Sequence, residues 1–248
     1  MTVTLTLTHA RFHLLEAVRI PIALIGSAFF PAASMLFFVV PFTRGDAVGA
    51  TYATASMLTF TVMTTNLFQY GIGVATDRDQ PWSPYLRTLP SGPLPSFAGR
   101  IVAGLAMMLL SVIPVLVIAT LLTPATVSPG GLLAGLGALI LAAVPFTLMG
   151  LAIGYALPAK AAIVVAQVLF LPLAFGGGLF TGGPGTEPGF IATVAPFLPT
   201  RGAAELMWAA TVGFPIDGTS LTALIGWTLA LLGLAIWAYR RDEGRRFS

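Results

Sequence analysis

The chain contains no cysteine and very little charge. Of its 248 residues only 8% are charged, while 56% are hydrophobic. The absence of cysteine excludes disulfides, thiolate metal sites and a cysteine nucleophile. A soluble domain carries about 25% charged residues, and a water-exposed fold of this length cannot cover so much apolar surface. With a mean hydropathy of +0.91, the sequence therefore predicts an integral membrane protein in a lipid bilayer.

Six apolar stretches are each long enough to cross a bilayer as a helix, which takes about 20 residues. None of the six contains a charged residue. Proline occurs inside several of them, and membrane helices tolerate it where neighbouring helices bond the freed carbonyls. The sequence therefore predicts one all-α transmembrane domain over residues 1–248. The six predicted spans are Ile20–Phe42, Thr51–Thr76, Ile101–Thr123, Leu132–Ala159, Ala161–Gly183 and Thr219–Tyr239.

The basic residues lie almost entirely on one side of this topology. If the N-terminus is cytoplasmic, only Arg44 and Arg201 of the 12 Lys and Arg residues fall on the outer side. Membrane proteins keep such an excess on the cytoplasmic side. We therefore expect a multi-pass protein of the cytoplasmic membrane with both termini inside. The same bias accounts for the net charge of +3, so a nucleic-acid partner is not expected.

The predicted spans lack the residues that carry proton and acyl-transfer chemistry. They contain no Asp or Glu, and His9 and His13 both precede the first span. Proton-coupled transporters usually place an ionisable residue in the bundle, and serine hydrolases need a histidine beside the nucleophile. The chain also lacks a Walker A loop. We therefore expect no enzyme activity, metal or cofactor in this chain, and any ATP hydrolysis belongs to another subunit.

Residues 9–19 form an amphipathic pattern ahead of the first span. On a helical wheel, His9, His13, Glu16 and Arg19 share one side, and the other side is apolar. This pattern is typical of a helix that lies on a membrane surface, here the inner one. The alternative is an ordinary polar leader.

The longest inner loop, residues 77–100, predicts a short helix over Pro84–Leu89. Ser83 precedes this helix as an N-cap, and Pro90 follows it as a stop. The loop carries aromatic and leucine side chains that a hydrophilic connector does not need, which favours a protein partner on the cytoplasmic side. The alternative is that these side chains lie among lipid headgroups, where Trp and Tyr are common.

Uncharged polar residues gather in the second and fifth predicted spans. Asn66, Gln69 and Tyr70 lie in the second span, and Gln167 lies in the fifth. An amide without a partner in hydrocarbon is costly, so these residues either bond neighbouring helices or line a substrate path. Both interpretations stay open. A path of this kind suits a neutral or weakly cationic amphipathic molecule, which aromatic faces attract.

The segment between the last two spans, residues 184–218, is apolar for a loop and contains Arg201 and Glu205. We expect short helices here, packed in the outer membrane interface. Thr200 is positioned to cap one that runs through Trp208. The preceding glycine-rich stretch lacks the lysine of a phosphate-binding loop, so nucleotide binding there is not expected.

The inner loop also carries a pattern that resembles the ABC-2 type permeases, the membrane subunits of bacterial exporters of drugs, polysaccharides and lipids. The acidic–basic–acidic triplet Asp77-Arg78-Asp79 ends the second span, and a basic residue, Arg100, opens the third. Between them lies the run Tyr85-Leu86-Arg87-Thr88-Leu89-Pro90. After the triplet the chain departs from the usual Gly-Thr and Glu of the family, which indicates a divergent subunit.

The resemblance implies a fold like that of the type V ABC exporters, with six spans, an interfacial N-terminal helix, a coupling helix and short outer helices. It implies export of small amphipathic drugs or other lipophilic compounds, energised by a separate ATPase subunit that binds ATP and Mg²⁺. It also implies a dimer with a second permease copy or a paralogue. The coupling residues it implies are Asp77, Arg78, Asp79, Tyr85, Leu86, Arg87, Thr88 and Leu89, and the path residues are Asn66, Gln69, Tyr70 and Gln167. The alternative class is a secondary transporter or channel without an ATPase partner.

The first prediction concerns topology and follows from the charge asymmetry. Cysteines introduced at Ser83 and Arg245 should react with a membrane-impermeant maleimide only from the cytoplasm. A cysteine at Thr186, beside Glu187, should react only from outside. Because the chain has no cysteine of its own, labelling in right-side-out and inverted vesicles reports these positions alone. The reverse pattern would contradict the topology.

Overall fold

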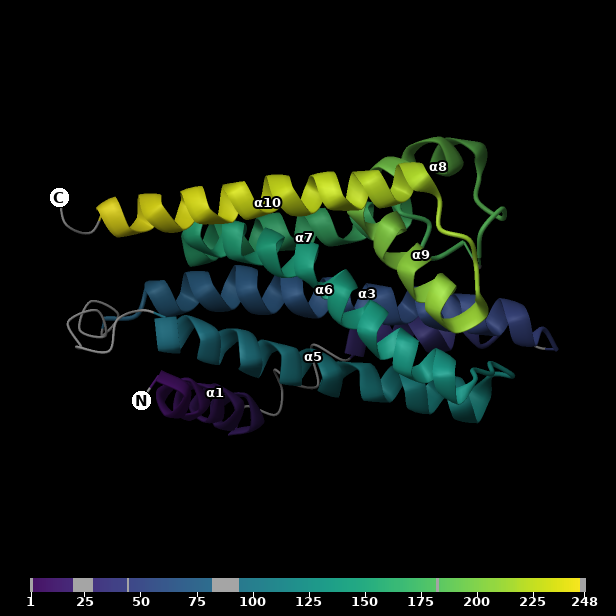
Figure 1. The fold of residues 1–248 in the computed structure, drawn as a ribbon, viewed down its shortest axis with the longest axis horizontal. Helices are drawn as coiled ribbons and strands as arrows, with labels where there is room; N and C mark the ends of the chain where they lie inside the picture. Colours follow the sequence, from purple (N-terminus) through teal and green to yellow (C-terminus); the bar gives the residue numbers. More distant parts are fainter. Residues whose placement is uncertain (1, 20–28, 44, 82–93, 182, 246–248) are drawn as a thin grey trace.

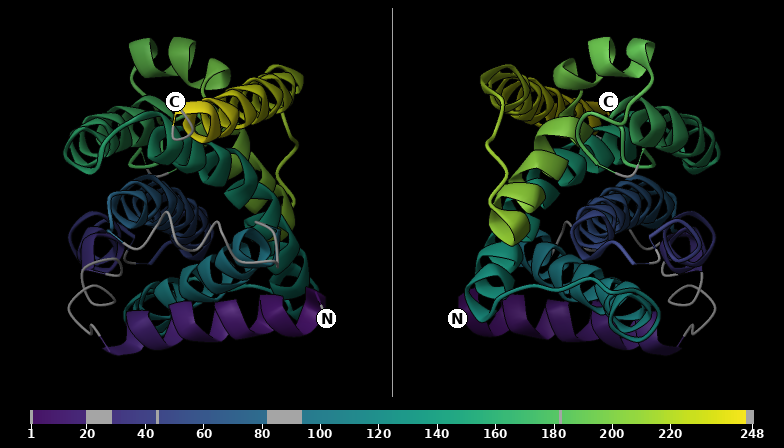
Figure 2. Two further views of the ribbon diagram at one scale, coloured as in Figure 1. Left: turned by 90° about the vertical axis from the view of Figure 1, so that its left-hand side faces the viewer. Right: turned by 90° about the vertical axis from the view of Figure 1, so that its right-hand side faces the viewer.

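The structure is a computed structural model that describes residues 2–19, 29–43, 45–81, 94–181 and 183–245. Its long helices run side by side as one bundle (Figure 1). They are α3 (Ala47–Arg78), α5 (Leu94–Leu122), α6 (Pro129–Ala156), α7 (Ala159–Gly176) and α10 (Gly218–Arg245). Figure 2 views these helices end-on and shows α1 (Thr2–Arg19) lying across the bundle. The described ranges contain no strand, which confirms the all-α class there.

The two ends of the bundle carry different elements. Helix α1 and the last turn of α10 lie at one end, named here the terminal end (Figure 1). The short helices α8 (Gly189–Val194) and α9 (Pro199–Val212), joined by the 3₁₀ turn η2 (Ala195–Phe197), lie toward the other, named the distal end. Short helices before α10 were predicted, and the structure confirms them.

Four helices of the described part are long and apolar enough to cross a membrane. They are Pro95–Leu122, Pro129–Ala156, Ala159–Gly176 and Gly218–Glu243, and they correspond to the last four predicted spans. The first predicted span, residues 20–42, lies partly outside the described residues. Within them, an apolar helix covers Phe29–Val39 and ends in the π-helical turn η1, Met35–Val39. Six crossings therefore stay a prediction.

The second predicted span is helix α3, which is buried along most of its length and contacts α5, α6, α7 and α9. Its 32 residues extend about 48 Å at 1.5 Å per residue, more than the roughly 30 Å hydrocarbon core. It is not among the four helices that are long and apolar enough to cross a membrane, because threonines and an asparagine interrupt its apolar residues. The Thr54 hydroxyl donates to Ala50 O and the Thr61 hydroxyl to Met57 O, both at 2.7 Å. This bonding to the preceding turn lets a polar helix be buried without unsatisfied hydroxyls at these positions.

Two expectations about the segment from α7 to α9 are wrong. Helix α7 ends at Gly176, well before residue 183, because a glycine run follows and Gly178 has a left-handed φ of 77°. Thr200 does not cap α9, which begins at Pro199; its hydroxyl donates to Leu173 O of α7 at 2.7 Å. The small-residue face of α9, which includes Ala203, packs against α3, α6 and α10. Helix α9 is therefore packed into the bundle, and its place in the outer membrane interface stays a prediction.

Helix α1 presents a face that differs in part from the one predicted. Glu16 and Arg19 are exposed, as predicted, but His9 and His13 are half-buried, whereas Val3 and Phe12 are 73% and 65% exposed. The cause is the close approach of α1 to α5 at Gly99, where an added Cβ would lie 2.6 Å from the Cβ of His9. The histidines therefore pack toward the bundle, and apolar side chains face outward, as in a helix that contacts lipid.

A second prediction follows from the close crossing of α3 and α6. A Cβ added at Gly154 would lie 2.5 Å from Tyr70 O, and one at Gly150 would lie 2.8 Å from Asn66 O. Because these are backbone oxygens, the two helices must separate. We expect Gly154→Ala to lower the free energy of unfolding by about 1–3 kcal/mol, the usual cost of overpacking, as measured by thermal melting in detergent.

The matched control is Gly137→Ala on the same helix, where no atom lies within 4 Å of the added Cβ. This change should leave the melting temperature unchanged or raise it slightly, because alanine favours helix more than glycine does. Equal melting temperatures for the two variants would contradict the crossing.

Candidate functional site

The last turn of α3 carries the triplet, and its arginine lies where several helices meet at the terminal end. The Arg78 guanidinium donates to the carbonyls of Gly154 and Leu157, at 2.6 and 3.2 Å, where α6 ends. Its other terminal nitrogen pairs with Asp242 of α10, whose side chain is 4% exposed. A cation is favourable at a helix C-terminus, and the buried carboxylate needs a counter-charge. Arg78 therefore fastens α3 to both α6 and α10.

The two acidic residues of the triplet bind two further helices. Asp77 pairs with Arg100 of α5. Asp79 accepts a hydrogen bond from the Ala159 backbone N–H at 3.2 Å, at the first residue of α7, where a negative charge is favourable. The three consecutive side chains thus contact α5, α6, α7 and α10.

Helix α1 reaches the same network through His13. Burial lowers the pKa of His13, and the charge of Arg100 lowers it further, against the opposing effects of Asp77 and Glu16. The folded protein therefore holds the imidazole neutral. Because the unfolded chain binds the proton more readily, acidification below the ordinary histidine pKa of about 6.5 removes stability.

The structure brings part of the predicted coupling set together. Asp77, Arg78 and Asp79 form the network described above, and their contacts are with this chain's own helices. The remaining members, residues 85–89, lie outside the described residues, so their docking role stays a prediction. Asp242 was missed, because two neighbouring acids near a C-terminus give no sign of which one turns into the bundle.

Two of the predicted path residues are buried between helices. Asn66 Nδ2 donates to Val62 O at 2.7 Å, and its Oδ1 accepts from the Thr147 hydroxyl of α6 at 3.2 Å. The Tyr70 hydroxyl donates to Ile101 O of α5 at 3.3 Å. Both side chains are about 2% exposed. In this structure they tie α3 to its neighbours, and a place on the path stays a prediction for them.

The other two path residues lie nearer the surface. Gln69 is half-buried on α3, and Gln167 is exposed on α7. Gln167 lies within a stripe of exposed apolar side chains that includes Val164, Val168 and Leu171. Beyond Lys160 in its first turn, this exposed face of α7 is therefore apolar except for a single amide.

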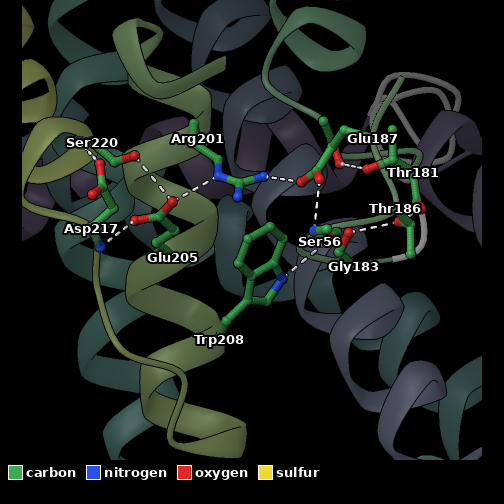
Figure 3. Close-up of polar contacts among 12 residues, drawn as sticks. Ser56, Thr181, Gly183, Thr186, Glu187, Arg201, Glu205, Trp208, Asp217 and Ser220 are labelled. Atoms are coloured by element: carbon green, nitrogen blue, oxygen red, sulfur yellow. Dashed lines mark hydrogen bonds and ion pairs between the residues drawn. The ribbon is translucent and has the colours of Figure 1, made fainter. Parts of the chain in front are cut away.

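A second ionic cluster lies at the distal end (Figure 3). Arg201 Nε donates to Glu205 Oε1 at 2.7 Å, and another guanidinium nitrogen pairs with Glu187. Glu205 also accepts from the Ser220 hydroxyl and from the Asp217 backbone N–H, both at 3.0 Å, where α10 begins. A buried carboxylate with this many donors is satisfied. The cluster joins α9 to α10 and to the loop that carries Glu187.

Trp208 connects this cluster to α3. The Arg201 guanidinium carbon lies 4.8 Å from the centroid of the fully buried Trp208 ring, a cation–π arrangement. The indole N–H donates to Ser56 Oγ of α3 at 3.1 Å (Figure 3). The spacing of four residues between Arg201 and Glu205 could have indicated that pair, but nothing in the sequence indicates Glu187.

Several helices of the bundle are long and apolar enough to span a membrane, and the described ion pairs lie near its two ends. These features place the chain in the class of multi-pass membrane proteins. The profile of the ABC-2 type transporter family matches residues 4–211, and the chain therefore belongs to that family. It is similar to the Bacillus subtilis (strain 168) protein named "Putative transport permease YvfS", with 22% identity over 189 residues, 76% of each chain. The predicted resemblance to this family is confirmed.

A third prediction tests the terminal-end network. Asp242→Asn removes the negative charge beside Arg78 but keeps a hydrogen-bonding group of the same size. We expect a loss of about 1–3 kcal/mol in the free energy of unfolding, the usual effect on a buried charged hydrogen bond, seen as a lower melting temperature. Glu243→Gln is the control, because within the described part of the chain Glu243 accepts a hydrogen bond from Tyr239 of its own helix, at 2.8 Å, and from no other helix. A similar loss in both variants would contradict a special role for Asp242.

Proposed function

We propose that this chain is the transmembrane permease subunit of an ATP-driven exporter, energised by a separate ATPase subunit. Membership of the ABC-2 type transporter family makes it a transport permease and not an enzyme. The observation that carries the proposal is the triplet at the end of α3. Its side chains bind four helices immediately before the loop whose sequence predicts an ATPase-docking helix.

The triplet supports mechanical coupling through this loop. A displacement of the loop acts first on Asp79 and Arg78, and their bonds pass it to α7, α6 and α10. Charged groups with several partners resist separation, because a bare charge in the bundle is costly. Helices bound in this way move as a unit, as a permease with two states of access requires. In this proposal the terminal end faces the cytoplasm, and both termini lie inside.

The exposed face of α7 is where we place a second permease copy or a paralogue. Its apolar side chains, such as Val164 and Val168, suit burial against another helix or lipid. The substrate path then runs between α3 and α7, beside Gln69 and Gln167. Phe68 and Phe170 meet edge-to-face there at 5.4 Å. Amides and aromatic rings without a fixed charge suit a small amphipathic drug or another lipophilic compound.

The alternative is a secondary transporter or channel that works without an ATPase. A specific observation separates the two. The described ion pairs of this bundle lie in two clusters, around Arg78 and Arg201, and none occupies the middle of α3, where a proton-coupled carrier would place one. Transport by the purified chain alone, without ATP and without a partner, would support the alternative.

The fourth prediction tests the ATPase partner. Leu86→Asp together with Leu89→Asp places two charges on the predicted docking helix, and an uncompensated buried charge costs several kcal/mol. A micromolar complex is held by only about 8 kcal/mol. The variant should insert normally but fail to co-purify with an ATPase that a photoreactive ATP analogue labels.

Gln80→Asp is the control, since it adds charge to the same loop without removing an apolar side chain. It should retain the labelled ATPase. Normal co-purification and ATP-dependent transport by the Leu86→Asp and Leu89→Asp variant would exclude this helix as the coupling element.

A further inference from the structure

A strap covers the distal end of the bundle between α7 and α8. It is defined here as residues 178–181 and 183–187. Its first residues point into the bundle, because Leu179 is 1% exposed and the Phe180 ring meets Phe38 at 5.3 Å and Phe60 at 5.1 Å between centroids. Phe180 also stacks on Phe175 at the end of α7. The strap thus closes the distal side of the aromatic contacts between α3 and α7.

The other end of the strap is held by an ion pair. Glu187 bonds Arg201 of α9, and its second carboxylate oxygen accepts from the Gly185 backbone N–H at 2.7 Å. Burial alone would raise the pKa of Glu187, but the hydrogen bond and charge of Arg201, together with hydrogen bonds from the backbone of Glu187 and Gly185, outweigh it and hold that pKa below its usual value. The carboxylate is therefore ionised at neutral pH, and the pair is lost only when the pH falls through this lowered value.

The backbone of the strap turns at glycines. Gly178 and Gly185 have φ of 77° and 84°, which other residues adopt only with strain. Hydrogen bonds from Thr186 to Thr181 O and Gly183 O keep the strap folded on itself. A self-bonded segment with glycine turns near both ends is able to swing as one piece, since its internal bonds need not break.

The Glu187–Arg201 pair can also separate at a small free-energy cost on the α9 side. If Glu187 leaves, Arg201 keeps Glu205 at 2.7 Å and the Trp208 face at 4.8 Å. Glu205 in turn stays bonded to the start of α10. Breaking a buried ion pair is unfavourable when it leaves an unpaired buried charge. Here neither Arg201 nor Glu205 is left unpaired. On the strap side, the leaving carboxylate keeps its Gly185 N–H.

We propose that Arg201 and Glu187 form a latch, and that the strap is the distal gate of the transport path. When the latch releases, Phe180 leaves the aromatic contacts between α3 and α7 and the distal end opens. The gate role rests on the proposed function, because it assumes that the path runs between these helices. The latch itself does not.

The experiment uses Leu179→Cys as a reporter in the full chain, which has no other cysteine. Leu179 belongs to the strap and is buried against the bundle, so a membrane-impermeant maleimide reaches it only when the strap opens. Adding Glu187→Gln should raise the labelling rate about tenfold, the factor that corresponds to about 1.4 kcal/mol. Asp46→Asn is the matched control, since it removes a carboxylate at the start of α3 while asparagine still caps that helix.

An unchanged labelling rate in Glu187→Gln would overturn the latch, whatever the chain transports. If that variant does not fold, Glu187→Asp, which shortens the side chain and keeps the charge, replaces it with the same expectation. In vesicles with the partner ATPase, ATP turnover should accelerate labelling of the reporter in the chain that retains Glu187. Turnover without acceleration would overturn the gate while leaving the ATP-driven exporter intact.

Discussion

The structure depends on burying a polar helix at the centre of an apolar bundle. Helix α3 carries threonines and an asparagine through most of its buried length, and a buried polar group without a partner is costly. Most of its buried threonine hydroxyls bond the turn before them, as those of Thr54 and Thr61 do, whereas the Thr65 hydroxyl has no hydrogen-bond partner among the described residues. Asn66 needs a second helix, and Thr147 of α6 supplies the bond. That bond holds only if α6 comes close, and Gly150 and Gly154 make room for it.

Charge enters this bundle near its ends, and each end uses one arginine in the same way. Arg78 holds a buried carboxylate and two carbonyls of α6, and Arg201 holds two carboxylates and an aromatic face. An arginine with several partners can release one of them without becoming a bare buried cation. Each cluster therefore holds its helices together and can still exchange one partner of its arginine. A permease with two states needs this property, and a single buried ion pair lacks it.

Hydrophobic runs predicted the helices well, because membrane helices are defined by length and apolarity that a sequence displays directly. The same reasoning failed for α1, since the wheel assumed that histidines face water. The approach of α5 at Gly99 instead draws His9 and His13 inward. The end of α7 was placed too late because glycines count as apolar although they end helices. Asp77, Arg78 and Asp79 were found through a family pattern, whereas Asp242 and Glu187 reach their partners only through the tertiary fold.

The two clusters are not independent, because α3 connects them. Arg78 lies in its last turn, and Ser56 lies about 33 Å away along the same helix at 1.5 Å per residue. Ser56 accepts the Trp208 N–H, and Trp208 lies against the guanidinium of Arg201. A shift of α3 that begins at the triplet therefore moves the Trp208 ring. Because Arg201 lies against this ring and pairs with Glu187, the shift also acts on that ion pair. In the proposed exporter, the helix that ends at the ATPase-facing loop is thus also the helix that reaches the strap, so one rigid element biases both ends between two states.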